Sequence, residues 1–161
     1  MALPALLNAI RSQLGQVQWI HTLRAPATAE QVQHLPLGLR CLYEITDGIG
    51  IHHIKYRGEI VGTALEALPA DEVIPIDQAM YGTNAQPRDW IGHEWLAVAR
   101  ASDSAFYIAL DPRQDKFYSV NPIVRDEVEL IASSSAEYFA WLLSSLPSSE
   151  QLNVATQHSA A

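Results

Sequence analysis

The side chains best suited to do chemistry in this sequence are histidines with a reactive neighbour. In "WIGHEWLAVA", residues 90–99, His93 and Glu94 lie side by side between two tryptophans. A zinc-protease helix would need a second histidine one turn later, and Ala97 stands at that position. If the segment is a strand, His93 and Glu94 point to opposite faces and cannot share a metal ion. The pattern therefore predicts the wall of a sheet rather than a reactive centre.

Two further groupings could in principle act as catalytic or metal sites. His52 and His53 are adjacent, so on a strand at most one of them could join a given site. Asp103 and Asp111 could form the carboxylate pair of a hydrolase, but they fall at the turn and at the far end of an expected hairpin. Turn residues of this kind usually cap backbone amides. The sequence also lacks a Gly-x-Ser-x-Gly elbow and a glycine-rich phosphate loop.

We therefore expect no enzymatic activity, no cofactor and no bound metal. A small enzyme that uses His52, His53 or the region of Asp103 stays open as an alternative.

Length and composition favour one folded domain. The chain has 161 residues, of which 48% are hydrophobic and 17% charged. We expect a single domain over residues 1–147 and a flexible serine-rich tail over 148–161. Cys41 is the only cysteine, no convincing signal peptide is present and no stretch approaches a membrane span. These features predict a cytoplasmic protein without membrane contact.

The charge of the chain limits its partners. Lysine and arginine total 10 against 18 aspartate and glutamate residues, a formal net charge of −8. Direct binding to nucleic acid is not expected, because it needs a basic patch. An acidic surface suits a basic protein partner, although it also simply favours solubility.

The elements follow an order of helices, then strands, then a closing helix. Helices are predicted near the N-terminus, after a capping box at Thr28 and Gln31, from Pro36, around residues 77–81, and after a second capping box at Ser134 and Glu137. A glycine with positive φ is expected at Asp47-Gly48. Strands are predicted in "QVQWI", "IGIHHIKYRG", "EIVGTAL", "EWLAVA", "AFYIALD", "KFYSV" and "VELIA". This order predicts an α+β fold, a mostly antiparallel sheet with helices packed on one face or end.

Aromatic residues crowd the last strands. Phe106-Tyr107 and Phe117-Tyr118 are adjacent pairs, so each pair places one ring on either face of the sheet. One ring of each pair therefore lies under a helix or is available to a partner.

Three motifs resemble those of the SUKH superfamily, which includes the SMI/KNR cell-wall regulators and many bacterial immunity proteins. The first is "LPLGLRCLYEITDGI", residues 35–49, with Leu-Pro, two helical leucines, a tyrosine and Asp-Gly. The second is "WIGHEWLAVARASDSAFYIALDP", similar to the central hairpin of the family, and the third is the closing segment "LIASSSAEYFAWLL". The likeness spans residues 28–145. The chain departs from the family pattern at Ile49, in "SDSAF" and at Ser135.

The resemblance implies a SUKH-like protein-binding module, with no catalytic residues to carry over. It implies an immunity protein, or antitoxin, that neutralises a bacterial toxin, with a basic toxin domain such as a nuclease as the partner. A housekeeping or regulatory scaffold of the same fold is the alternative. From the chemistry of the side chains, the expected partner-binding residues are Asp89, Trp90, Asp103, Tyr107, Asp111 and Asp115.

Overall fold

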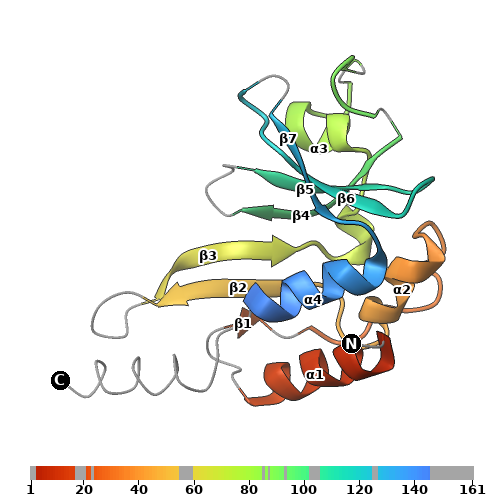
Figure 1. Cartoon of the computed structure of the whole chain (residues 1–161). Helices are drawn as coiled ribbons and strands as arrows, with labels where there is room; N and C mark the ends of the chain where they lie inside the picture. Colours follow the sequence, from red (N-terminus) through yellow and green to blue (C-terminus); the bar gives the residue numbers. More distant parts are fainter. Residues whose placement is uncertain are drawn as a thin grey trace.

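A computed structural model describes residues 3–16, 21–22, 24–54, 60–84, 86, 88–92, 94–101, 106–124 and 127–145. Its centre is a seven-stranded antiparallel sheet in which every strand pairs with its neighbours in the sequence (Figure 1). The strands are β1 (His21–Thr22), β2 (Ile49–Ile54), β3 (Ile60–Ala67), β4 (Leu96–Ala101), β5 (Tyr107–Asp111), β6 (Lys116–Val120) and β7 (Val128–Ala132). The predicted α+β class with a mostly antiparallel sheet is confirmed.

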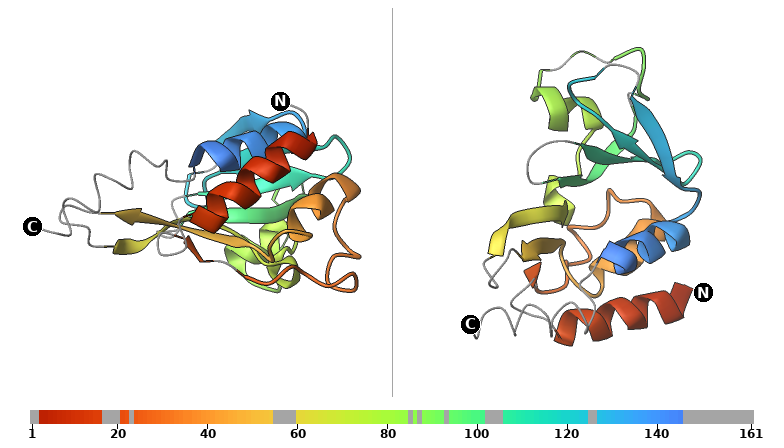
Figure 2. Two further views of the ribbon diagram at one scale, coloured as in Figure 1. Left: turned by 90° about the horizontal axis from the view of Figure 1, so that it is seen from below. Right: turned by 60° about the vertical axis from the view of Figure 1, so that its left-hand side comes forward.

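Helices cover both faces of this sheet. The four α-helices are α1 (Leu3–Gln16), α2 (Leu37–Tyr43), α3 (Ile76–Tyr81) and α4 (Ser135–Ser145), and a short 3-10 helix, η2, spans Ala70–Glu72. Helices α1 and α2 both contact α4, and the three lie together on one side of the sheet (Figures 1 and 2). Tyr107 of β5 donates a hydrogen bond to the carbonyl of Ala79, so α3 packs against the opposite face.

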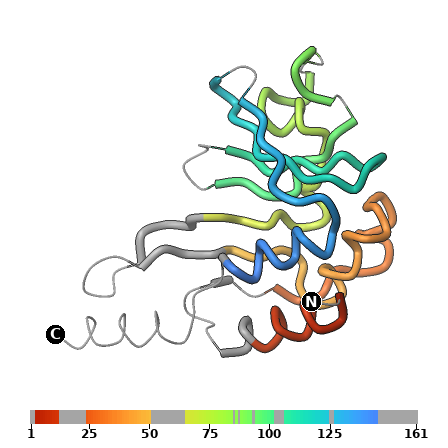
Figure 3. The backbone as a smooth tube through the Cα atoms, in the orientation of Figure 1, coloured from red at the N-terminus to blue at the C-terminus, as the bar shows by residue number. Residues whose placement is uncertain are grey.

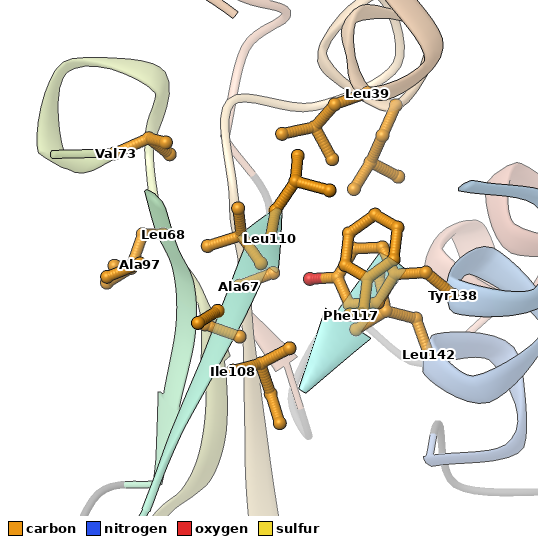
Figure 4. Packing of buried hydrophobic residues seen from close by; sticks show 14 of the residues in the cluster. Leu39, Ala67, Leu68, Val73, Ala97, Ile108, Leu110, Phe117, Tyr138 and Leu142 are labelled. Atoms are coloured by element: carbon orange, nitrogen blue, oxygen red, sulfur yellow. The ribbon is translucent and has the colours of Figure 1, made fainter. Parts of the chain in front are cut away.

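The core forms where α4 crosses the sheet. The rings of Phe117 on β6 and Tyr138 on α4 stack with their centroids 4.3 Å apart, and both side chains are buried. Leu110 on β5 lies opposite Phe117 in the sheet register and therefore shares its face. Figure 4 shows these side chains together with Leu39 of α2 and Leu142 of α4. Tyr138 and Leu142 therefore lie on the face of α4 that closes the core.

Helix α2 begins after Pro36, as predicted. Leu39, Leu42 and Tyr43 share its buried face, and Thr46 beyond its end is buried as well. Gly48 has φ +92, and a Cβ there would lie 2.7 Å from the carbonyl oxygen of Ala67. The predicted positive φ is confirmed, and the close approach of β3 is a second reason for glycine.

Three sequence predictions need correction. The segment "EWLAVA" is strand only from Leu96, because Trp95 donates its amide to the carbonyl of Gly92 in a turn. Thr28 and Gln31 do form the reciprocal capping hydrogen bonds, but turns rather than a regular helix follow them. In the second capping box, Ser134 accepts from the amide of Glu137, whereas Glu137 accepts from Ser133 instead of Ser134.

Some predictions fall outside the described residues. These are residues 17–20 of the strand predicted in "QVQWI", whose first residue, Gln16, instead ends α1. The turn that the sequence predicts at Arg57-Gly58, between the second and third strands, and the tail 148–161 also lie outside them. Of the helices in the described part of the chain, none is both long and apolar enough to cross a membrane.

Candidate functional site

A surface hollow of about 250 Å³ lies at the α3 end of the sheet. Three segments that are far apart in the sequence meet there: the end of α3, residues 88–90, and the connection from β6 to β7. The lining side chains are Tyr81, Arg88, Asp89, Trp90, Pro122 and Ile123. Two aromatic rings and two aliphatic groups therefore share the hollow with one basic and one acidic group.

Helix α3 positions the other two segments. The hydroxyl of Tyr81 donates to the carbonyl of Pro122 at 2.8 Å, which ties the β6–β7 connection to the helix. The guanidinium carbon of Arg88 lies 4.2 Å from the centroid of the Tyr81 ring, a cation–π geometry. Asp77, only 4% exposed, accepts from the backbone amide of Arg88 at 3.3 Å. Residues 88–90 are therefore held from within the fold.

The β6–β7 connection presents apolar side chains to solvent from an ordered turn. The side-chain oxygen of Asn121 accepts from the amides of Ile123 at 2.8 Å and Val124 at 3.2 Å. The amide group of Asn121 donates to Glu127 across the turn. Ile123 is nonetheless 86% exposed and Val124 49% exposed. Apolar side chains held in this way outside the core are typical of binding surfaces.

The predicted site residues separate into two groups. Asp89 and Trp90 line the hollow, and Tyr107 lies on the same face of the sheet, against α3. Asp111 lies at the other end of β5, about 13 Å from Tyr107 at ~3.3 Å per residue, and Asp115 follows in the next turn. Asp103 lies outside the described residues. Of the five that the structure describes, only Asp89 and Trp90 line the hollow.

Asp111 and Asp115 both bind backbone amides. Asp111 is nearly buried and accepts from the amide of Arg113 at 3.0 Å, the turn-capping role weighed for it above. Asp115 accepts from the amide of Ser135 at 3.0 Å and from its hydroxyl at 2.8 Å. From the β5–β6 turn it therefore caps the start of α4. Helix α2 packs closely against this cap, because a Cβ on Gly38 would lie 2.6 Å from the Ser135 hydroxyl oxygen.

The histidine-based alternatives gain no geometric support. His93 and the side chains of His52 and His53 lie outside what the structure describes. Glu94 forms an exposed ion pair with Arg113, at 2.6 Å between Oε2 and Nε. Among the described residues, no group of three or more histidine, cysteine, aspartate or glutamate side chains could hold a metal ion.

The aromatic pair of β6 is covered on both faces. Phe117 stacks on Tyr138 of α4, and Tyr118 stacks on Trp95 with centroids 4.5 Å apart and planes nearly parallel. A Cβ on Gly92 would collide with the Trp95 indole, so this glycine lets the indole fold down onto the sheet. The rings of this pair are therefore part of the fold, whereas Ile123 and Val124 in the connection after β6 are exposed.

Sequence reasoning missed Tyr81, Arg88, Pro122 and Ile123 as members of the site. The one available signal was Pro122-Ile123-Val124, an apolar run placed in a turn rather than in a strand. Comparison of the chain with protein-family models, with curated proteins and with solved structures found no match.

Proposed function

We propose that this protein is a protein-binding module that acts as an immunity protein in the cytoplasm. It binds a basic toxin domain, such as a nuclease, and covers the surface that the toxin needs. In this proposal the protein acts through its binding surface alone, without catalysis, a cofactor or a metal.

One observation carries this proposal: the exposed side chains of Tyr81 and Ile123 line the hollow, and exposed Val124 follows Ile123 in the chain. Five large hydrophobic side chains are exposed among the described residues, and Tyr81, Ile123 and Val124 are three of them. A fourth, Leu130, lies on the adjoining strand β7 and is 48% exposed. Partly buried Trp90 adds a large aromatic group of the kind that anchors protein interfaces.

Charge supports a basic partner. The chain carries a formal net charge of −8. Asp89 lines the hollow, and Glu127 and Glu129 are exposed on the β6–β7 hairpin that also carries Ile123. Acidic groups around an apolar centre attract a basic domain and orient it before contact. The sequence resemblance to the SUKH superfamily points in the same direction.

A growth-protection assay tests the proposal. The product of the gene adjacent to the one for this chain is expressed alone and together with this protein. The first condition should arrest growth and the second should restore it, while an unrelated toxin should remain active in both. If the neighbouring product is harmless, or if it stays toxic in the presence of this protein, the immunity role is wrong. Weak contacts with many host proteins would instead support a regulatory scaffold.

A further inference from the structure

Strand β7 forms one end of the sheet. It pairs with β6, and among the described residues no strand pairs with its other side. Figure 3 shows the backbone of β6 and β7 and its continuation into α4. Ile123, which lines the hollow, belongs to the connection that leads into β7.

The hydrogen-bond pattern shows which backbone groups face outward. Asn121 donates its amide to the carbonyl of Glu127 at 3.2 Å, so these two residues occupy a hydrogen-bonded position at the turn end of the hairpin. In the register, Val120 lies opposite Val128, Ser119 opposite Glu129 and Tyr118 opposite Leu130.

Antiparallel pairs alternate between hydrogen-bonded and non-hydrogen-bonded. Glu129 therefore exchanges hydrogen bonds with β6, whereas the amides and carbonyls of Val128 and Leu130 point away from the sheet. An added antiparallel strand would form backbone hydrogen bonds with two outward-facing residues at this spacing.

The side chains of β7 favour an added strand with a particular sequence pattern. Val128 and Leu130 lie on the same face of the sheet as Tyr118. Glu129 lies on the other face and is exposed. A segment that alternates apolar and basic side chains would place the first against Leu130 and the second against Glu129.

A second copy of this chain fits less well. Antiparallel pairing about a two-fold axis at Glu129 would set two glutamates directly opposite each other, a destabilising pair. Each copy would also bring a net charge of −8 to the interface.

We propose that β7 is a docking edge to which an extended, basic segment of the partner protein adds as an eighth strand. The added strand pairs with the outward amides and carbonyls of Val128 and Leu130. Its neighbouring residues reach the hollow over Ile123. The identity of the natural partner rests on the proposed function, but this mode of binding does not.

Amide hydrogen exchange, followed residue by residue by NMR, tests whether the edge is open. In the isolated protein the amides of Val128 and Leu130 should exchange at least about tenfold faster than that of Glu129. Equal protection of all three would show that the edge is already occupied, by the rest of this chain or by a second copy, and would overturn the proposal.

A short blocked peptide in which lysine alternates with valine serves as the probe for the occupant. It should slow exchange at Val128 and Leu130 and shift their amide resonances, whereas a peptide with glutamate in place of lysine should not. Glu129→Lys should weaken the lysine peptide about fivefold, from the loss of one opposite-charge cross-strand pair and its replacement by a like-charge pair. Glu30→Lys, the same change at an exposed position outside the sheet, should leave binding unchanged.

Two results would overturn strand addition: no effect of the lysine peptide on β7 amides, or equal binding of both peptides. These outcomes are separable from the growth assay. Peptide binding without protection would refute the immunity role alone, and protection without β7 involvement would refute the docking edge alone.

Discussion

At the scale of single residues, Asp115 is an acidic side chain of the type that binds a basic partner, but its hydrogen bonds stabilise the fold. It adopts φ +54, and its carboxylate holds both the amide and the hydroxyl of Ser135. Since those bonds close the start of α4, its contribution to stability is expected to exceed any contribution to binding.

Asp115→Ala should lower the free energy of unfolding by about 1–2 kcal/mol, from the loss of the helix cap. Asp115→Asn is the matched control, because asparagine tolerates positive φ and can still accept one of the hydrogen bonds. Urea denaturation measures both. If Asp115→Ala leaves the free energy of unfolding unchanged, the carboxylate has no capping role. A role for Asp115 in partner binding would then be supported instead.

Substitution of the two described glycines with positive φ, Gly48 and Gly82, distinguishes the cost of backbone strain from the cost of a steric clash. Gly48 approaches β3 closely, whereas a Cβ on Gly82 would meet no atom within 4 Å. Gly82→Ala should cost about 1 kcal/mol from φ alone. Gly48→Ala should cost about 1–3 kcal/mol more, because the backbone of Ala67 and Pro69 must also move. Equal losses in thermal or urea unfolding would contradict this distinction.

At the scale of elements, α2 is pinned to the chain that leaves β3. The hydroxyl of Tyr43 donates to the carbonyl of Leu68 at 2.5 Å, and Asp47 accepts from the amide of Ala70 at 2.8 Å. Burial raises the pKa of the Tyr43 hydroxyl well above its usual value, and the charge of Asp47 adds to this. Tyr43 is therefore neutral in the folded protein at any physiological pH.

Tyr43→Phe should cost about 1–2 kcal/mol near neutral pH, because the buried carbonyl of Leu68 loses its donor. Tyr43 keeps its proton in the folded state when the unfolded chain begins to ionise, so its contribution to stability is present below about pH 10 and declines above it. The difference between wild type and Tyr43→Phe should therefore narrow in urea titrations carried out above about pH 10. A difference that stays constant or grows would contradict the stated environment of Tyr43.

The elements that were predicted best from the sequence are bounded in the sequence by residues typical of turns. Strands β4, β5 and β6 were predicted from three β-rich apolar runs that turn-type residues, Asp103 and Pro112 among them, separate in the sequence, so these local signals were enough. "WIGHEW" was less tractable, because the hydrogen bond from Trp95 to Gly92 and the stack of Trp95 on Tyr118 are tertiary features. After Thr28 the capping bonds form as predicted, yet no regular helix follows, since capping alone does not bury a helical face.

The candidate site was predicted only in part. Asp89 and Trp90 were selected for their chemistry, and they do lie in the hollow. The contact of Tyr81 with Pro122 joins residues 41 positions apart, which no local pattern reveals. Asp111 and Asp115 matched the same chemical criterion but are used as caps, because composition does not distinguish a carboxylate that faces an amide from one that faces solvent.

At the scale of the whole molecule, charge should govern how fast a partner arrives. Raising the ionic strength from about 0.1 M to about 1 M shortens the Debye length from ~10 Å to ~3 Å. The association rate with the basic partner, measured by stopped-flow fluorescence, should then fall about tenfold, while the dissociation rate changes less. An association rate that does not depend on salt would show that the acidic surface does not steer the encounter.

The most direct test of the central claim, that the surface around the hollow binds a protein, is the affinity of two matched variants for the toxin partner. Ile123→Asp and Leu37→Asp each place a carboxylate at a highly exposed apolar position, with exposures of 86% and 76%, and only the first lies at the hollow. In calorimetric titrations Ile123→Asp should weaken binding by about 2 kcal/mol or more, roughly thirtyfold. Leu37→Asp should bind as the wild type does. Equal affinities for the two variants, or a larger loss from Leu37→Asp, would place the binding surface elsewhere and contradict this account.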